Sequence, residues 1–454
     1  MADQYTTALA LRKLMIVVLM MVIVNAGATL PVASPAATDG IRLEMTRVDH
    51  IRGNFSKLEM LQRAVRRSRH RANTLVMRAV LAAGNGLGDE VQAPVHAGSG
   101  EFIMDLAIGT PPVPFPAILD TGSDLIWTQC KPCTQCYRQK TAIFDPSSSK
   151  SFSKLPCSSK LCRALPTSTC DSDCQYVYSY GDYSSTQGVL ATETFTFGYT
   201  SSSSKKAVSV AGIGFGCSGS NEGKGFEQAA GLVGLGRGPL SLNSQLGVGK
   251  FSYCLTKLDD SSKKSPLLLG SVAKLSSGHA QSTPLLRSAT QPSFYYLSLK
   301  GITVGATALS IPKDTFAFSD DGSGGLIIDS GTSITYLEKA AYGPLKKAFL
   351  SQVKLPVGNG SDVGLDLCFQ LPEGGSSADG VEVPKLVLHL DGADMQLPAE
   401  NYMILDGSSG QLCLMVMGSN GMSILGNFQQ MNFHVLYDVE GGRLAFEPAH
   451  CDQL

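Results

Sequence analysis

The chain has 454 residues, which is too long for one ordinary hydrophobic core. Hydrophobic residues make up 43% of it and charged residues 17%, a composition that excludes a disordered protein. Aspartate and glutamate number 38 against 37 lysines and arginines, so the overall charge gives no support for nucleic-acid binding. The balance conceals an asymmetry, because residues 29–90 carry a net charge of +4 and residues 91–454 carry −6.

The N-terminus has the pattern of a secretory signal peptide. Arg12 and Lys13 precede an apolar run over residues 14–24, which is too short to span a bilayer, and Ala26 and Ala28 supply a small-residue cleavage site. We expect a signal peptide over residues 1–28; a short membrane anchor is the alternative. No later segment is apolar enough to span a membrane.

Residues 29–92 form a separate basic segment. Apolar residues recur at helical spacing between Leu58 and Leu81, among many arginines, and the sequence GNGLGDE at 84–90 is typical of an exposed, cleavable loop. We interpret the segment as a removable prosegment, with a permanent helical extension as the alternative. Its positive charge, opposite in sign to that of the rest of the chain, suggests that it covers acidic residues there at neutral pH and detaches when their carboxylates are protonated.

From about Gly98 onward the pattern is that of short strands. Alternating apolar residues begin at 102–108, and Gly441 and Gly442 mark a hairpin near the C-terminus. One stretch, 337–354, has helical spacing. We therefore predict an all-β protein with a few short helices, in two halves, 93–260 and 261–454, separated at the serine- and lysine-rich stretch 259–265.

The cysteines indicate an oxidising compartment. All 12 lie between Cys130 and Cys451, which favours disulfides in a secreted protein. A zinc site is the alternative for the cluster that begins CKPCTQC, but no histidine lies between His96 and His279 to complete it. We expect no metal and no cofactor; the match of residues 214–219 to G-x-G-x-x-G lacks the following helix that a dinucleotide site needs.

The two halves repeat a motif. AILDTGSDLIW at 117–127 and LIIDSGTSITYL at 326–337 each place an aspartate, a hydroxyl residue and a glycine after an apolar run. Each motif has a later apolar-apolar-glycine partner, AAGLVGLG at 229–236 and MSILGNF at 422–428. A carboxylate in an apolar frame is costly to bury unless it has a function, and two such copies are a specific signal.

These paired motifs resemble those of the pepsin-like aspartic proteases over residues 98–454. The cysteine-rich stretch after the first motif is similar to the secreted plant nepenthesin type, and the long saposin-like insert of other plant members is absent. The resemblance implies a bilobal fold of two β-barrel-like lobes with a cleft between them. It implies that Asp120 and Asp329 form a catalytic dyad that shares a proton, because neighbouring carboxylates cannot both ionise easily.

The resemblance also assigns roles to the neighbours of the dyad. Thr121 and Ser330 match the hydroxyl pair that bonds across the two loops, and Ser123 and Thr332 match the hydroxyls that bind the carboxylates. Gly122 and Gly331 allow the backbone to turn tightly beside the carboxylates. Ordinary turn-capping is the alternative for the four hydroxyl residues.

A flap over the cleft is implied as well. Tyr180, Gly181 and Asp182 match the tip of the family's flap, and the indole of Trp127 matches the group that reaches the flap tyrosine. A core aromatic is the alternative for Trp127. Tyr183 stands where glycine is usual, which is expected to stiffen the flap or alter what it covers.

Disulfide connectivity cannot be deduced from the sequence, and the resemblance alone suggests a pairing. The pairs it implies are Cys130–Cys133, Cys136–Cys217, Cys157–Cys174, Cys162–Cys170, Cys254–Cys451 and Cys368–Cys413. Sequons for N-glycosylation occur at Asn54 and Asn359, and only the second remains after removal of the prosegment.

The resemblance implies an acid endopeptidase that is made as a zymogen and secreted to the extracellular space (apoplast) or the vacuole. We expect a monomer that acts on peptide or protein substrates, binds pepstatin-like inhibitors, and has no nucleic-acid partner. The alternative is an inactive binding protein of the same fold that inhibits cell-wall hydrolases. The presence of both aspartates, both glycines and the hydroxyl residues favours the enzyme.

Overall fold

The computed structural model describes a set of residues that lie in one compact unit, Asp39–Leu454. They are residues 40–52, 55–82, 102–180, 184–198, 207–223, 226, 229–258, 263–276, 278–318, 324–372 and 380–454. The predicted signal peptide, the predicted cleavable loop and Asn54 lie outside the described residues. No helix among the residues described is long and apolar enough to cross a membrane.

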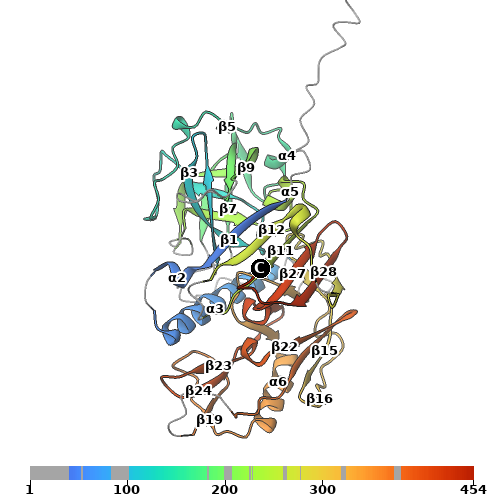
Figure 1. Cartoon of the computed structure of the whole chain (residues 1–454). Coiled ribbons are helices and arrows are strands. Elements are labelled where there is room, and N and C mark those ends of the chain that lie inside the picture. The colour runs from blue at the N-terminus through green and yellow to red at the C-terminus, as the bar shows by residue number, and fades with distance from the viewer. Residues whose placement is uncertain are drawn as a thin grey trace, which may run out of the picture. The chain divides into compact units, whose positions relative to one another are not determined.

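Strands dominate the described chain, as the alternating pattern predicts. A large sheet of fifteen strands within the described residues has the order β13-β28-β27-β11-β12-β1-β2-β3-β10-β4-β9-β8-β7-β6, with β5 paired to β8 (Figure 1). Its strands are β1 (Ile41–Arg47), β2 (Phe102–Ile108), β3 (Val113–Asp120), β4 (Trp127–Gln129), β5 (Ser153–Lys154), β6 (Ser168–Cys170), β7 (Cys174–Ser179), β8 (Ser185–Phe197), β9 (Val208–Glu222), β10 (Gly231–Gly234), β11 (Lys250–Cys254), β12 (Ser265–Leu269), β13 (Gln281–Pro284), β27 (Phe433–Asp438) and β28 (Arg443–Pro448).

The second lobe contains smaller sheets. The first has the order β14-β17-β26-β18-β25, the second β16-β15-β21-β22, and the third β19-β20-β24-β23. Their strands are β14 (Tyr296–Leu297), β15 (Leu299–Val304), β16 (Thr307–Ala308), β17 (Leu326–Ile328), β18 (Thr335–Glu338), β19 (Val357–Gly358), β20 (Cys368–Gln370), β21 (Leu386–Leu390), β22 (Ala393–Leu397), β23 (Met403–Asp406), β24 (Gln411–Leu414), β25 (Val416–Ser419) and β26 (Ser423–Leu425).

Helices are short except for two, both in regions where the sequence predicts a helix. The α-helices are α2 (Val48–Arg52), α3 (Lys57–Ala82), α4 (Lys160–Arg163), α5 (Leu242–Gln245) and α6 (Lys339–Gln352), and the 3-10 helices are η1 (Pro146–Ser148), η2 (Gly270–Val272), η3 (Ala399–Asn401) and η4 (Asn427–Gln430). A capping box begins α3: the amide of Glu59 donates to Ser56 Oγ at 3.2 Å, and the amide of Ser56 donates to Glu59 Oε2 at 2.8 Å.

The large sheet joins the two ends of the chain. Strand β1 lies between β12 and β2 and is antiparallel to both, so the N-terminal basic segment is part of the sheet. Strands β27 and β28 form the predicted C-terminal hairpin; β27 also pairs with β11, and β28 also pairs with β13. The predicted boundary at residues 260/261 falls between β11 and β12, which pair with each other in this sheet.

The repeated motifs have the same local fold in each half. Strand β3 lies parallel to β10, with Asp120 opposite Gly234. Strand β17 lies parallel to β26, with Ile328 opposite Leu425, one residue before Asp329. The internal repeat read from the sequence is therefore a structural repeat, in which each motif pairs with its own apolar-apolar-glycine partner.

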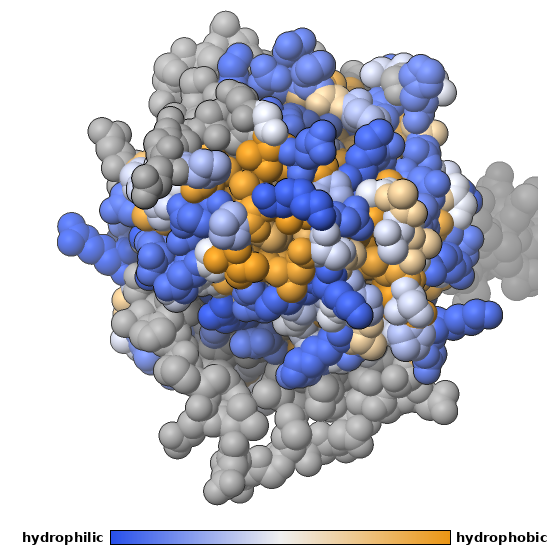
Figure 2. Space-filling model, turned by 90° about the horizontal axis from the view of Figure 1, so that it is seen from below, coloured by the Kyte–Doolittle hydropathy of each residue, from blue (hydrophilic) through white to orange (hydrophobic). Residues whose placement is uncertain are grey.

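One outer face carries exposed apolar side chains. Figure 2 views the molecule from below, the side of β19, β24 and α6 in Figure 1, and shows apolar residues gathered among charged ones. On α6 and β19 the large hydrophobic side chains that are exposed are Leu350 and Val357. Exposed apolar residues are normal on a globular surface, and we assign no ligand to this face.

All twelve cysteines are described, and they form six disulfides with no free thiol. Two expected pairs, Cys254–Cys451 and Cys368–Cys413, are present. The other four expected pairs, Cys130–Cys133, Cys136–Cys217, Cys157–Cys174 and Cys162–Cys170, are wrong, and the observed bonds are Cys130–Cys217, Cys133–Cys136, Cys157–Cys170 and Cys162–Cys174.

Strand pairing and burial explain the corrections. Strand β4 runs parallel to β9, and Cys130, directly after β4, lies 5.3 Å (Cα–Cα) from Cys217 of β9. The other two cysteines of the surface loop, Cys133 and Cys136, are then left to bond to each other. Cys162 and Cys174 are both buried, at 2% and 0% exposure, and belong to one apolar cluster. Cys157 and Cys170, the partners that were expected for them, lie nearer the surface and bond to each other.

Candidate active site

The two motif aspartates meet between the lobes. Asp120 is the last residue of β3, and Asp329 directly follows β17. Their side chains are 2% and 0% exposed. Because each aspartate lies at the carboxyl end of a strand in a parallel pair, the strand geometry of both lobes fixes where the carboxylates lie.

Each carboxylate is held by its own turn. For Asp120, the amide of Gly122 donates to Oδ1 at 2.9 Å and the hydroxyl of Ser123 donates to Oδ2 at 2.5 Å. The second turn repeats this pattern. There the amide of Gly331 donates to Asp329 Oδ1 at 3.2 Å, and Thr332 Oγ1 donates to Oδ2 at 2.5 Å. Hydrogen bonds to the charged form favour an ionised carboxylate.

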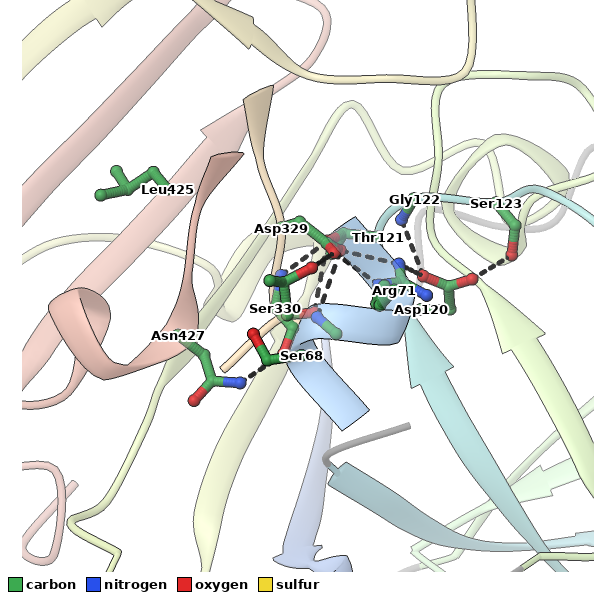
Figure 3. Close-up of polar contacts among 12 residues, drawn as sticks. Ser68, Arg71, Asp120, Thr121, Gly122, Ser123, Asp329, Ser330, Leu425 and Asn427 are labelled. Carbon is green, nitrogen blue, oxygen red and sulfur yellow. Dashed lines mark hydrogen bonds and ion pairs between the residues drawn. The ribbon is translucent and has the colours of Figure 1, made fainter. Parts of the chain in front are cut away.

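The two turns are also bonded to each other. Thr121 Oγ1 lies 3.3 Å from Ser330 Oγ and accepts the amide hydrogen of Ser330 at 3.1 Å. Its hydroxyl lies 3.3 Å from Asp329 Oδ1. All three residues are buried, and Figure 3 shows them close together. A residue of the first lobe thus bonds both the backbone and the carboxylate of the second.

A guanidinium from the basic segment lies between the carboxylates. Arg71, in α3, contacts Asp120 Oδ1 through Nη2 and Asp329 through both Nε, at 2.5 Å from Oδ2, and Nη2, at 2.9 Å from Oδ1. Although burial opposes the charge, the two carboxylates raise the pKa of Arg71 above its ordinary value. Burial alone would raise the pKa of Asp329, but the charge of Arg71 together with the hydrogen bonds from Arg71, Thr332 and Gly331 lowers that pKa. In this form a single cation contacts both carboxylates (Figure 3).

The motif glycines leave the space that Arg71 occupies. A Cβ at Gly122 would lie 2.6 Å from Arg71 Nη2, and a Cβ at Gly331 would lie 2.7 Å from Arg71 Cζ. Real Cβ atoms do not come this close to another heavy atom. Any larger residue in either turn would therefore displace the guanidinium from the carboxylates.

Helix α3 is fixed along the second lobe by further contacts. Ser68 Oγ accepts the amide hydrogen of Ile334 at 2.8 Å, and Arg69 Nη2 donates to the carbonyl of Gly364 at 2.7 Å. The apolar side of the helix, including Leu61 and Val65, belongs to a buried cluster with residues of the second lobe. Figure 1 shows α3 between the strands of the two lobes.

A second ion cluster ties α3 to α2. The carboxylate of Asp49, which is 2% exposed, accepts hydrogen bonds from Arg63 Nε at 2.6 Å and from Arg67 Nη2 at 2.5 Å. Burial raises the pKa of Asp49, but the two arginines outweigh it and lower that pKa. Arg63, Arg67 and Arg71 are four residues apart and therefore share one face of the helix.

The described part of the predicted flap contains the tyrosine–tryptophan contact. Tyr180 directly follows β7, and Trp127 Nε1 donates to its hydroxyl at 2.8 Å. Phe226 packs edge-on against both rings. Burial raises the pKa of Tyr180 well above its ordinary value, so the hydroxyl stays neutral. Gly181, Asp182 and Tyr183 lie outside the described residues.

Sequence reasoning missed several residues of this site. Asp49 and Arg71 lie in the basic segment, whose net charge and helical spacing point to no particular charged residue; the four-residue spacing of the arginines was the available signal. Asn427 and Gln430 follow the second apolar-apolar-glycine motif and contact the Asp329 turn from behind. Among the described residues, no cluster of His, Cys, Asp or Glu could hold a metal ion.

Comparison with known proteins places this geometry in a family. Residues 102–271 match the family model described as xylanase inhibitor N-terminal, and residues 294–448 match xylanase inhibitor C-terminal. The chain is 49% identical over 419 residues to aspartic proteinase nepenthesin-1 of Nepenthes gracilis, covering 92% of this chain and 91% of that protein. The chain belongs to the nepenthesin-type, pepsin-like aspartic proteases. Aspartyl protease 37 of Oryza sativa subsp. japonica is 38% identical, covering 94% of this chain and 97% of the relative.

Solved structures show that the fold is the pepsin-like bilobal one. The crystal structure of edgp matches with a TM-score of 0.62 at 20% identity, covering 79% of this chain and 94% of that one. Basic 7S globulin from soybean matches with a TM-score of 0.58 at 22% identity, covering 78% and 94%. In this nepenthesin-type chain, the predicted all-β fold with a few short helices is confirmed.

Proposed function

We propose that this chain is the inactive precursor of an acid endopeptidase, in which Arg71 binds both catalytic aspartates and blocks the space between them. The observation that carries the proposal is the bidentate contact of Arg71 with Asp329 and its further contact with Asp120. Hydrolysis by a dyad needs a water molecule and a peptide carbonyl within hydrogen-bond reach of the carboxylates. A guanidinium in that space excludes both.

The chemistry of the freed dyad follows from the removal of this cation. Without Arg71, Asp120 and Asp329 repel each other when both are ionised, so they hold one proton between them. The ionised carboxylate takes a proton from water as the water attacks the scissile carbonyl, and the protonated carboxyl donates to the carbonyl oxygen. The hydroxyls of Ser123 and Thr332 keep each carboxylate oriented during these transfers.

The organisation of the precursor is part of the proposal. It comprises a signal peptide (1–28), a basic prosegment (29–92), and lobes at 93–260 and 261–454. The mature protein is a secreted monomer of the apoplast or vacuole that cleaves peptide and protein substrates and binds pepstatin-like inhibitors. The named proteinases among its relatives and the location of α3 in the described structure support this reading.

The test is acid activation of the intact chain. The secreted protein is incubated at pH 4 and at pH 7, and its size and its cleavage of a denatured protein are followed with and without pepstatin. We expect shortening and pepstatin-sensitive cleavage at pH 4, and neither at pH 7. Asp120→Asn and Asp329→Asn are the matched controls, because they keep the side-chain shape and remove the acid. Absence of cleavage by the wild type under both conditions would refute the proposal.

A binding function is the second candidate, because the matching family models are described as those of a xylanase inhibitor. It predicts tight binding to a glycanase that Asp120→Ala leaves unchanged. The complete set of hydrogen-bond donors around both carboxylates favours the protease. A glycanase-binding assay with wild type and Asp120→Ala separates the two functions.

A further inference from the structure

The turns that contain Asp120 and Asp329 differ in the hydrogen bond that each aspartate's backbone carbonyl accepts. In the first lobe, the amide of Leu235 donates to the backbone carbonyl of Asp120 at 2.7 Å. The equivalent residue of the second lobe is Asn427, whose amide donates instead to the backbone carbonyl of Thr332 at 2.6 Å. The internal symmetry of the fold is therefore broken at the carbonyl of Asp329.

Gln430 supplies the contact to this carbonyl. Its Nε2 donates to the carbonyl of Leu425 at 2.9 Å and lies 3.5 Å from the carbonyl of Asp329, at the long end of the hydrogen-bond range. The Leu425 carbonyl also accepts the amide hydrogen of Asp329 at 3.2 Å. Through these two contacts Gln430, which is 0% exposed, joins the ends of β17 and β26 where the turn of Asp329 begins.

A chain of hydroxyl groups fixes the orientation of Gln430. Tyr253 Oη donates to Gln430 Oε1, and Tyr437 Oη lies 2.7 Å from Tyr253 Oη. Because the single hydroxyl hydrogen of Tyr253 is used toward Gln430, Tyr437 must be the donor in the second contact. Both rings are 0% exposed, and burial raises both pKa values, so each hydroxyl keeps its hydrogen.

The two tyrosines belong to the large sheet that also carries the other aspartate. Tyr253 lies in β11 and Tyr437 in β27, which pair with each other, and β3 of the same sheet ends at Asp120. The hydroxyl chain therefore links the Asp329 turn to the sheet that positions Asp120. This provides a route by which the two carboxylates keep a fixed relative position.

The peptide group between Asp329 and Ser330 is the unit that this link orients. Its carbonyl faces Gln430, and its N–H donates to Thr121 Oγ1 in the first lobe at 3.1 Å. Rotation of this peptide would tilt the Asp329 side chain and break the bond to Thr121. We infer that Gln430 is a positioning residue for Asp329, held in its working orientation by Tyr253 and Tyr437.

This inference rests on the proposed hydrolytic function for its kinetic consequences. A misplaced carboxylate slows proton transfer but leaves the remote binding contacts of a substrate intact, so kcat is expected to fall while KM stays nearly constant. A general loss of folding would instead lower the amount of active enzyme. Titration of active sites with pepstatin separates these effects.

The kinetic experiment compares three variants of the acid-activated enzyme. Gln430→Leu keeps the approximate volume and removes both polar atoms, and Tyr253→Phe removes only the donor to Gln430 Oε1. Tyr402→Phe is the control. The hydroxyl of Tyr402 donates a hydrogen bond to the carbonyl of Pro384 at 2.8 Å and is part of neither the Tyr437–Tyr253–Gln430 hydrogen-bond series nor the dyad. We expect kcat per titrated site to fall about ten- to a hundredfold in Gln430→Leu, less in Tyr253→Phe, and within twofold in the control.

A second measurement needs no catalysis. In the intact precursor, amide hydrogen exchange of the segment 329–333 is expected to accelerate in Gln430→Leu and Tyr253→Phe and to remain unchanged in Tyr402→Phe. If the wild type hydrolyses no peptide, the proposed function fails, but the exchange data still test whether Gln430 and Tyr253 hold the Asp329 turn in place. Wild-type kcat and exchange in Tyr253→Phe would overturn the inference, even if Gln430→Leu failed to fold.

Discussion

Arg71 forms a bidentate contact with the carboxylate of Asp329, in which Nε lies 2.5 Å from Oδ2 and Nη2 lies 2.9 Å from Oδ1. The fork of a guanidinium matches the two oxygens of a carboxylate, which gives this contact both strength and direction. Since the same Nη2 also contacts Asp120, the helix that carries Arg71 has one register in which the contact can form.

Arg71→Gln should release the prosegment at a higher pH than the wild type. Breaking a buried ion pair from one side leaves uncompensated charge and typically costs about 3–5 kcal/mol, here against the docked helix. The measurement is the rate of chain shortening between pH 4 and pH 7. Arg66→Gln, an exposed position on the same helix, is the control, and equal rates in the two variants would contradict the role of Arg71.

Asp49→Asn should also shift release toward neutral pH. The pKa of Asp49 is lowered in the docked state, because the two arginines outweigh the effect of burial. The carboxylate therefore stabilises docking above its ordinary pKa, and this stabilisation is lost as the pH falls through the lowered value. The variant lacks it at every pH. The pH midpoint of prosegment loss checks this against Asp105→Asn, an exposed carboxylate, which should match the wild type.

Ser330→Thr should retain activity, whereas Ser330→Ala should lose roughly tenfold in kcat. Threonine keeps the hydroxyl that lies 3.3 Å from Thr121 Oγ1, and alanine leaves a buried polar partner with one fewer contact. Steady-state kinetics of the activated variants provide the comparison. Equal kcat values for the two variants would show that the cross-lobe hydroxyl contact is dispensable.

Removal of the Cys130–Cys217 bond should destabilise the protein more than removal of Cys133–Cys136. Loop-closure entropy for sequence separations of 87 and 3 gives about 4–5 and about 2 kcal/mol, respectively. Thermal unfolding of the two double-alanine variants measures the difference, and peptide mapping without reduction checks the pairing itself. A larger loss from the short loop would contradict the entropic argument.

Asn359 should carry an N-linked glycan when the chain passes through a secretory pathway. The residue is exposed, and its Oδ1 accepts the amide hydrogen of Ser361 at 3.1 Å, so the sequon forms a surface turn. Endoglycosidase treatment should increase mobility on a gel, and Asn359→Gln should abolish that shift. Persistence of the shift in this variant would point to another acceptor.

Local patterns in the sequence were sufficient for the strands and for the two motifs. The apolar frames of Asp120 and Asp329 reflect buried parallel strands, and their partners could be found because the motif occurs twice. The long helix followed from apolar spacing, since one face of α3 packs on the second lobe. These features depend on residues near one another in the chain or on a repeated pattern.

Long-range choices were not predictable in the same way. Cys170 and Cys174 face each other across a hairpin, so their partners depend on which side α4 packs, and burial decided in favour of Cys162 with Cys174. The role of Arg71 depends on where α3 packs relative to Asp120 and Asp329, which are distant from it in the sequence. Gln430 was missed because its amide group contacts the Asp329 turn through backbone carbonyls, which no sequence pattern marks.

In the proposed maturation of this protein, the location of β1 separates two events. The strand is hydrogen-bonded to β12 on one edge and to β2 on the other, and it continues into the segment that carries Arg71. Cutting the chain between α3 and β2 breaks one covalent link and none of these main-chain bonds. The cleaved segment would then persist as a tightly held peptide ligand, so the onset of activity would follow its dissociation and would slow when free segment is added back.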